Sequence, residues 1–321
     1  MTDAFAGPWA ESLTAFVAFK RSLGFKYVTE ARILQRFDRW TGLAPADRAA
    51  LTPAVVEAWL VRGPLEGDKT QRHRLGVLRH FALYLTTQGC AAHIPEPQAA
   101  TRHYTFVPHI FTAHEIQQIF TEADRLVPHR RSTVPLVLPV LFRVLYGCGL
   151  RISEALQLTL PDWDPAAQTL TIRASKFGKD RVVPLAPSLA TVVGTYVATV
   201  HAASPPSARL FGDRDGGPLT PDRVYRRFRD ILWYAGIPHR GKGHGPRVHD
   251  LRHTFAVHAL KAAVDRDVDL QAVLPVLSAY LGHASLAATE QYLRLTADAF
   301  PALRATLDHA TGWVIPEVAW E

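Results

Sequence analysis

Cysteine is scarce in this sequence, whose 321 residues include only Cys90 and Cys148. Two cysteines in unrelated contexts form neither a disulfide framework nor a Cys-x-x-Cys metal motif. The sequence therefore excludes the small, disulfide-stapled secreted domains and fits a reducing compartment.

Long apolar runs are missing as well. The longest, VPLVLPVLF at 134–142, is too short to span a bilayer and holds two prolines. The first residues, MTDAFAGPWAESL, have no basic stretch followed by an apolar core, so they do not resemble a signal peptide. We therefore expect a soluble, cytoplasmic protein with no membrane partner.

Lysine is rare although the chain is basic. The net charge is +7, the isoelectric point is about 9.6, and only seven of the 36 basic residues are lysines. Such a charge favours a polyanionic partner, nucleic acid before membrane, and arginine suits bidentate contacts with phosphate. Nucleotide bias in the genome would give the same composition, so composition alone leaves both interpretations open.

Residues 1–95 have the apolar spacing of a small helical domain. Helices are predicted at 9–23, at 29–40, after the Thr52-Pro53 pair, which is typical of a helix start, and at 69–87. A basic helix side is commonly just solvated surface, but beside a domain that handles phosphate it is a candidate DNA contact. The candidates on the last of these helices are Lys69, Arg72, Arg74 and Arg79.

Residues 96–111 contain Pro97 and Pro108, follow directly on Pro95, and are typical of an extended linker. The next helix is predicted to start after Thr112, because Thr112 and Glu115 form a capping box. We expect a larger catalytic domain at 112–305 and a C-terminal tail at 306–321.

The larger domain is predicted to be α+β, in a chain that is mostly α overall. Residues 169–174 and 181–185 alternate like strands of a small antiparallel sheet and flank the turn SKFGKD. Helical spacing recurs at 134–146, 189–200 and 222–234. Further candidates for DNA contact lie on the last of these helices and in the glycine-rich stretch after it: Arg223, Arg226, Arg227 and Lys242.

The stretch from Gly243 to Arg294 carries the side chains of a phosphate-chemistry site. His249 and Arg252 are three residues apart in an apolar-periodic segment, so they share one face of a helix. Tyr292, a possible nucleophile, follows nine residues after a histidine. Arginine matches phosphate oxygens and histidine moves protons near neutral pH. The pattern indicates attack on a phosphodiester by a tyrosine.

Four motifs occur in order along the chain: GLRISE at 149–154, SKFGKDRVVPL at 175–185, HDLRHTFA at 249–256, and LGHAS followed by a tyrosine at 281–292. Together they resemble the tyrosine recombinases, also called phage-type integrases, over about residues 112–300. One such motif would be weak evidence, but four in order are specific. The resemblance implies a site-specific DNA recombinase that needs neither a metal, nor ATP, nor another cofactor.

The resemblance also implies a role for each matched residue. Tyr292 is the nucleophile, which attacks the scissile phosphate and leaves a 3′-phosphotyrosine and a free 5′-hydroxyl. Arg151 and Arg252 hold the non-bridging oxygens, because the transition state carries extra negative charge. Lys176 protonates the leaving 5′-oxygen, and His249 acts as acid or base near the tyrosine.

Two further positions follow from the resemblance, beside plainer alternatives. His283 hydrogen-bonds the phosphate, and Glu154 orients the catalytic groups, although an acid in the first turn of a helix is favoured in any case. Lys179 competes for the role of the hairpin lysine. His253 stands four residues after His249, as in a zinc pair, but HDLRH is not HExxH and no third ligand is offered, so we expect no metal site.

The resemblance implies an assembly on double-stranded DNA. Two domains would form a clamp on the duplex, and a homo-tetramer, or a mixed tetramer with related recombinases, would hold two DNA sites in the nucleoid. The apolar tail residues would dock on the chain's own catalytic domain or on a neighbour. The run between Arg252 and His283 is longer than in compact relatives, which suggests a mobile-element subgroup. Alternatives are a type IB topoisomerase, a catalytically silent DNA-binding regulator and a metal-dependent nuclease.

Overall fold

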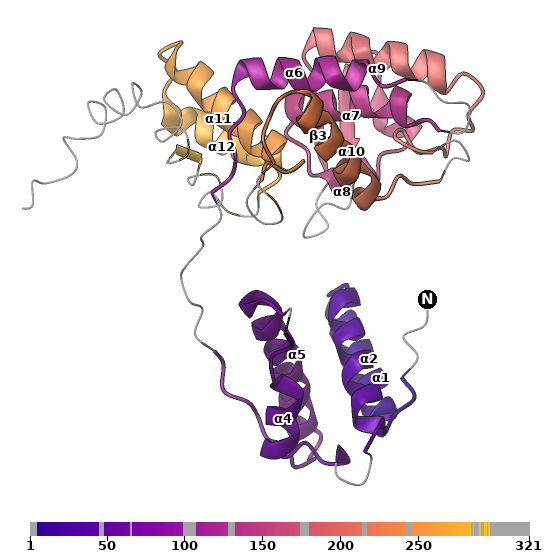
Figure 1. The fold of residues 1–321 in the computed structure, drawn as a ribbon, viewed down its shortest axis with the longest axis vertical. Coiled ribbons are helices and arrows are strands. Elements are labelled where there is room, and N and C mark those ends of the chain that lie inside the picture. The colour runs from indigo at the N-terminus through magenta and orange to yellow at the C-terminus, as the bar shows by residue number, and fades with distance from the viewer. Residues whose placement is uncertain are drawn as a thin grey trace, which may run out of the picture. The chain divides into compact units, whose positions relative to one another are not determined.

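The computed structural model divides into two compact units, residues 1–104 and residues 105–321 (Figure 1). Each unit has a hydrophobic core of its own. The structure describes residues 5–44, 48–64, 66–98, 107–127, 132–173, 180–213, 217–239, 241, 245–283, 285, 289, 292, 293 and 295.

The first unit is helical in its described part, as the sequence predicts. Its helices are α1 (Ala10–Ser22), α2 (Val28–Gly42), α4 (Pro53–Leu60) and α5 (Asp68–Thr87). Thr52 caps α4, because its hydroxyl accepts a hydrogen bond from the Val55 N–H at 3.3 Å. The helix starts and ends predicted from apolar spacing and caps are therefore confirmed within a few residues.

Aromatic side chains and one buried carboxylate hold the first unit together. Trp9 meets Phe81 edge to face, with ring centroids 5.7 Å apart. Asp38 is buried and accepts hydrogen bonds from the backbone N–H groups of Ala6, Gly7 and Trp9 at 2.9, 2.7 and 3.1 Å. The segment before α1 is thereby fixed to α2.

The second unit combines helices with one small sheet. In chain order its elements are α6 (Ala113–Asp124), α7 (Val134–Gly147), α8 (Ile152–Ala155), η1 (Leu160–Asp162), β1 (Trp163–Asp164), β2 (Thr169–Ile172), β3 (Arg181–Pro184), α9 (Pro187–Val200), α10 (Pro221–Tyr234), α11 (Asp250–Val264) and α12 (Leu270–Leu281). The prediction of a mostly helical chain with a small antiparallel sheet is confirmed.

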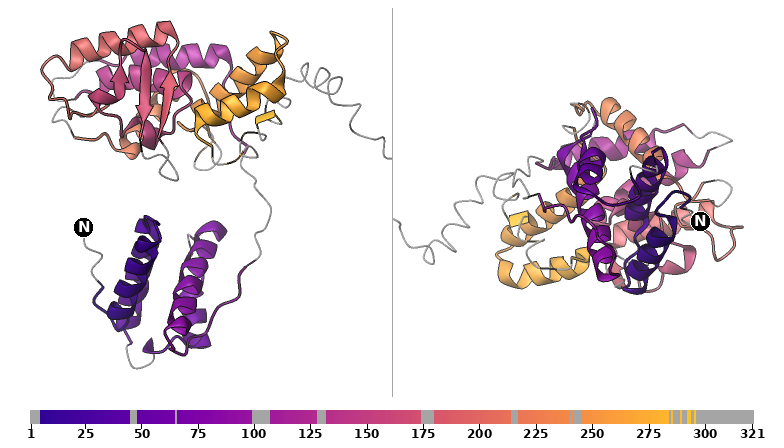
Figure 2. Two further views of the ribbon diagram at one scale, coloured as in Figure 1. Left: turned by 180° about the vertical axis from the view of Figure 1, so that it is seen from behind. Right: turned by 90° about the horizontal axis from the view of Figure 1, so that it is seen from below.

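The sheet has the order β1-β2-β3 with antiparallel pairing, and its strands are visible in the left view of Figure 2. Leu170 pairs with Val183, and both are fully buried, so this face of the hairpin lies on the core. The two-residue strand β1 was not predicted, because two residues are too few to show alternation.

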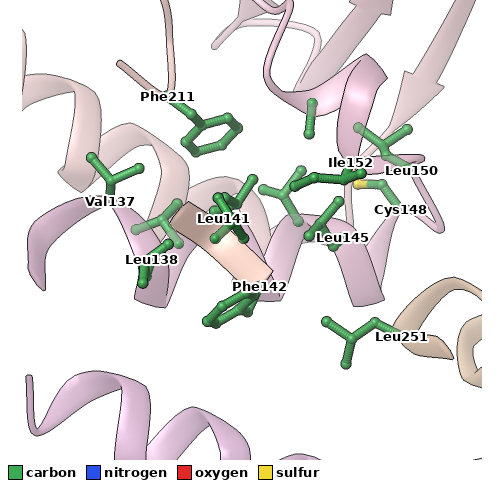
Figure 3. Packing of buried hydrophobic residues seen from close by; sticks show 14 of the residues in the cluster. Val137, Leu138, Leu141, Phe142, Leu145, Cys148, Leu150, Ile152, Phe211 and Leu251 are labelled. Atoms are coloured by element: carbon green, nitrogen blue, oxygen red, sulfur yellow. The ribbon is translucent and has the colours of Figure 1, made fainter. Parts of the chain in front are cut away.

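Helix α7 is the centre of the second unit, since it packs against α6, α8, α9 and α11. Its apolar residues occupy most of its surface, as expected of a helix buried on several sides. Figure 3 shows Leu141 and Leu145 of α7 in one core with Ile152, Phe211 and Leu251. This packing fixes the loop that follows α7, which carries the GLRISE motif.

The predicted linker ends inside the second unit's core. Phe111, its last residue, is fully buried and meets Phe228 edge to face. The Phe111 N–H donates to the hydroxyl of Thr254 on α11 at 3.0 Å. The end of this segment therefore belongs structurally to the larger unit.

A second, smaller core joins α11, α12 and Tyr292. It contains Val257, Leu260 and Leu281, all buried. In Figures 1 and 2, α11 and α12 lie side by side at one end of the second unit. Among the described residues, no helix has the length and apolar character needed to cross a membrane.

Candidate active site

Four segments of the second unit meet around one buried carboxylate, Glu154, and the arginines that pair with it. They are the loop after α7, strand β3, the start of α11 and the end of α12. The four motifs found in the sequence therefore reach the same place, although they are separated by up to about 130 residues in the chain.

The loop after α7 requires glycine at position 149. Gly149 has φ +58°, in the left-handed region that side chains disfavour. A Cβ there would lie 2.5 Å from a ring carbon of Phe255 and 2.7 Å from a methyl group of Leu281. The Gly149 carbonyl accepts a hydrogen bond from Arg252 Nη1 at 2.7 Å. Glycine thus lets the loop approach α11 closely enough to hold that arginine.

Glu154 is the counter-charge for the arginines of this site. Its carboxylate accepts hydrogen bonds from Arg151 Nη1 at 2.7 Å and from Arg181 Nη2 at 2.9 Å, and it lies 3.9 Å from Arg252 Nη1. Burial alone would raise the pKa of Glu154, but the bonds from Arg181 and Arg151 outweigh it and lower this pKa to about 2. Glu154 is therefore ionised at neutral pH.

Arg252 is held inside the protein. Its side chain is almost fully buried, and Nη2 donates to the Leu281 carbonyl at 2.8 Å while Nη1 donates to Gly149. These two carbonyls take two of the five N–H donors of a guanidinium. Burial, followed by the charge of Arg151, lowers the pKa of Arg252 to about 10, so it remains positive at neutral pH.

Three histidines and Tyr292 form a row beside the arginines. The rings of His249 and His253 meet edge to face, with centroids 4.7 Å apart, and His253 Nδ1 lies 3.1 Å from the Tyr292 hydroxyl. The His283 ring is nearly parallel to that of Tyr292, at 12° and 6.0 Å. His283 Nδ1 lies 2.7 Å from the hydroxyl of Thr289. Tyr292 itself is only 1% exposed.

The histidines of this row are neutral in the folded chain at pH 7. Burial, followed by the nearby positive charges, lowers the pKa of His249 and of His283 to about 4 each. The same causes lower the pKa of His253 to about 3. Fixed positive charge at the site therefore comes from the arginines, and the histidines provide hydrogen bonds.

Tyr292 lies close enough to Arg252 to interact with its charge, and a guanidinium group matches phosphate oxygens. Independently of the geometry, residues 109–298 match the phage integrase family, which is more than half of the chain. The chain belongs to the phage integrase family.

Known proteins of this kind are similar over about half of the chain or more. The y4rB protein of Sinorhizobium fredii, which carries the name of an integrase/recombinase, is 32% identical over 290 residues, covering 88% of this chain and 91% of that protein. The tyrosine recombinase XerC of Rhodospirillum centenum is 36% identical over 158 residues, covering 49% of this chain and 42% of its own. The Tn1549 transposon integrase in complex with transposon right end DNA has a TM-score of 0.63 at 17% identity, covering 94% of this chain and 99% of that one.

These findings confirm the resemblance drawn from the four motifs. The integrase family and the named recombinases support a DNA recombinase over a topoisomerase, a silent regulator or a metal-dependent nuclease. The likeness to the Tn1549 integrase shows a shared fold. The roles of single residues in the present chain stay predictions, because these likenesses concern the family and the fold.

The structure brings together most of the residues selected from the sequence. Those that lie around Glu154 or in the adjoining row are Arg151, His249, Arg252, His283 and Tyr292. His249 precedes α11 and stands at its cap position, one residue before the helix that was expected to include it. Lys176 lies outside the described residues.

Sequence reasoning missed two residues of this integrase site, Arg181 and His253. Arg181 donates two hydrogen bonds to Glu154 and one, from Nε, to the Tyr280 carbonyl at 2.9 Å. It stands inside the motif SKFGKDRVVPL, where only lysines were considered. His253 was weighed solely as a zinc ligand, whereas its Nδ1 lies within hydrogen-bond distance of the Tyr292 hydroxyl.

The basic residues of α5 divide into two groups. Arg74 donates to Glu66 at 2.8 Å and to the Val61 carbonyl at 3.0 Å, and Arg79 Nη1 donates to the Pro95 carbonyl, so both make bonds within their own unit. Lys69 is exposed. Arg72 lines a cavity of about 590 Å³ together with Lys20, Lys26 and Tyr27, among others. Lys69 is therefore better placed for a phosphate than Arg74 and Arg79, whose guanidinium groups are bonded within the unit.

The basic residues of α10 are exposed. Arg223 Nη2 donates to the hydroxyl of Ser132 at 3.2 Å, and Arg227 pairs with Asp230 at 3.3 Å. Arg226 is exposed on the same helix. Bonds of this exposed kind are weak enough to be exchanged for contacts with a ligand. Lys242 lies outside the described residues.

Proposed function

We propose that this integrase cuts and rejoins DNA strands through attack of Tyr292 on a phosphodiester. The observation that carries the proposal is the position of the Tyr292 hydroxyl, 3.1 Å from a neutral histidine and in the same buried cluster as Arg252. A phosphate that enters this cluster would meet a nucleophile and fixed positive charge together.

The chemical step is a transesterification. The phenol oxygen of Tyr292 forms a bond to phosphorus while the bond to the 5′-oxygen breaks, which leaves a 3′-phosphotyrosine. Arg151 and Arg252 stabilise the non-bridging oxygens, and Lys176 gives a proton to the leaving 5′-oxygen. His249, which is neutral at pH 7, takes the proton from the phenol of Tyr292, and His283 provides a hydrogen bond to the reacting phosphate. The phosphate bond energy is kept in the adduct, so rejoining by a 5′-hydroxyl requires no ATP.

Glu154 orients the arginines and does not meet the substrate. It accepts from Arg151 and Arg181 at the same time, which sets the direction of both guanidinium groups. With one buried negative charge shared among three arginines, the cluster retains a net positive charge for the phosphate. This explains why the carboxylate can be buried beside a site for an anion.

Binding is proposed to involve both units and double-stranded DNA. We assign residues 1–95 to a core-binding domain, 96–111 to a linker, 112–305 to the catalytic domain and 306–321 to a tail that docks in cis or in trans. The two domains would clamp the duplex, with Lys69, Arg72 and Arg226 among the phosphate contacts. Affinity should fall steeply with salt, because each phosphate contact releases a counterion.

The active assembly is proposed to be a tetramer on two DNA sites, of this chain alone or mixed with related recombinases. Its substrates would belong to a mobile element, which the longer segment between Arg252 and His283 supports. In the cell the protein would be cytoplasmic and associated with the nucleoid.

The test is selection of covalent adducts from a randomised duplex library carrying single nicks, in buffer with EDTA. A nick lets the cut fragment diffuse away, so the protein stays linked to DNA and resists denaturant. Wild type should give adducts of one sequence class, and Tyr292→Phe should give none while it shifts the same duplexes in a native gel. Equal adduct yields from the two proteins, or a requirement for a divalent metal, would refute the proposal.

A further inference from the structure

We propose that His253 is a positioning residue for Tyr292: its neutral imidazole accepts a hydrogen bond from the Tyr292 hydroxyl and fixes the direction of the O–H bond, and with it the direction of the lone pairs on the phenol oxygen. This assignment rests on the proposed function, because it concerns the nucleophile of that reaction. It separates His253 from His249, which takes the phenol proton in the proposed mechanism, and from His283, which contacts the phosphate.

The geometry follows from the position of His253 on α11. His253 is one turn beyond His249, whose ring it meets edge to face, so the two imidazoles lie on one side of the helix. Its neighbour Arg252 points to the carbonyls of Gly149 and Leu281. One short stretch of α11 thus supplies a guanidinium for the substrate and a hydrogen-bond partner for the nucleophile.

Burial makes this hydrogen bond necessary. Tyr292 is 1% exposed and His253 is 9% exposed, so water does not readily replace either partner. A phenol hydroxyl that loses a hydrogen-bond partner inside a protein costs free energy, and a restraint on its torsion is lost with it. The Tyr292 ring is also covered by the parallel His283 ring. The ring is therefore held by packing, and the direction of its hydroxyl by His253.

Burial, followed by the charges that face His253, keeps its imidazole neutral, so it accepts a proton poorly. They belong to Arg252 on its own helix, to Arg247 before that helix and, when protonated, to His249 and His283 on either side. Each disfavours an imidazolium, and burial adds to them. A neutral imidazole has one nitrogen without hydrogen, which can accept from a phenol. We therefore assign to His253 the orientation of the hydroxyl and not the removal of its proton.

A set of three substitutions separates these roles. Asparagine places an amide near the position of Nδ1, glutamine places it near Nε2, and phenylalanine fills the space without a polar atom. If Nδ1 orients Tyr292, cleavage by His253→Asn should stay within about tenfold of wild type. His253→Gln and His253→Phe should fall by about 100-fold, the loss typical of a small misplacement of a reacting group.

The assay is single-turnover cleavage of the selected nicked duplex, at saturating protein, between pH 5.5 and 9. The loss should appear in the rate of adduct formation and not in the affinity for DNA, and the pH profile of His253→Asn should have the shape of the wild-type profile. Thermal unfolding of wild type, His253→Phe, Tyr292→Phe and the double variant supplies an independent readout. The two single losses should be non-additive, since they remove the same hydrogen bond.

Several outcomes would overturn the assignment. Wild-type cleavage by His253→Phe would mean that the contact has no role, and faster cleavage would mean that it restrains the nucleophile. If the cleavage rate of wild type falls at low pH and that of a slow His253→Asn variant does not, then His253 accepts a proton in the reaction. If wild type forms no adduct through Tyr292, the proposed function fails, and non-additive unfolding would then show the contact to be structural only.

Discussion

Replacement of Glu154 by glutamine should destabilise the second unit through the loss of one charge. The substitution keeps the shape of the side chain and an oxygen that can accept from the Arg151 backbone N–H, which donates to Glu154 at 3.0 Å. It removes the negative charge shared by Arg151, Arg181 and Arg252. Three buried or half-buried guanidinium groups would then face one another without compensation, which is costly in a dry environment.

The size of the loss follows from the pKa of Glu154. A fall from the usual 4.5 to about 2 corresponds to about 3 kcal/mol of stabilisation of the ionised form in the folded chain. In a unit of this size, such a loss lowers the melting temperature by roughly 6–12 °C. Glu154→Gln should therefore melt lower than wild type by that amount at pH 7.

The stabilisation by ionised Glu154 should depend on pH in a definite direction. Because the pKa is lowered by folding, the stabilisation is complete above about pH 4.5 and is lost as the pH falls through about 2. The difference in free energy of unfolding between wild type and Glu154→Gln should thus be constant from pH 7 to 5 and shrink toward pH 3.

Asp162→Asn provides the matched control. Asp162 also accepts from a helix-capping backbone N–H, at 2.9 Å from Thr159, and from one arginine, Arg173 Nε at 2.6 Å. Arg173 is largely exposed, so this variant should lose less stability. Equal melting temperatures for wild type and Glu154→Gln, or a difference that does not change with pH, would contradict the role assigned to Glu154.

Three further predictions concern the reaction, the backbone and the tail. A substrate with a 5′-bridging sulfur has a leaving group that needs no proton. On it Lys176→Ala should recover its rate of adduct formation, and Arg252→Lys should not. Equal recovery of the two variants would mean that Lys176 is not the general acid. Gly149→Ala should lower the free energy of unfolding by about 2 kcal/mol or more, because φ at this position is +58° and the space for a Cβ is filled. Gly194→Ala in α9, where a Cβ meets nothing within 4 Å, should not lower it. Equal losses in the two variants would refute the argument. Deletion of 311–321 should keep single-site binding in gel shifts but abolish the synaptic complex and recombination, and normal recombination would exclude docking in trans.

Local signals predicted most of the fold. Thr52 and Thr112 act as helix caps in the structure, and Glu115 completes the capping box by accepting from the Thr112 N–H at 2.7 Å. Caps and apolar spacing involve residues a few positions apart, so the sequence alone contains the information. Phe111 gave no such signal, because its burial depends on α10 and α11.

The candidate site was predictable as a set of motifs but not as a set of contacts. Glu154 was identified, yet its pairing with Arg181 joins residues 27 positions apart. The bond between His253 and Tyr292 spans 39 positions and depends on how the segment after α12 returns to α11. Contacts of this range are decided by packing, which leaves no periodic pattern in the sequence. The predicted roles of Lys176, Lys242 and the tail at 306–321 concern residues outside the described part of the chain.

The measurement that tests the central claim most directly is identification of the amino acid bound to DNA. Adducts selected from the nicked library would be digested with protease and nuclease, and the linked peptide sequenced by mass spectrometry. We predict a single modified residue, Tyr292, joined to the 3′-phosphate of the cut strand with a free 5′-hydroxyl on the other fragment. A link to any other residue, or to a 5′-phosphate, would contradict the account.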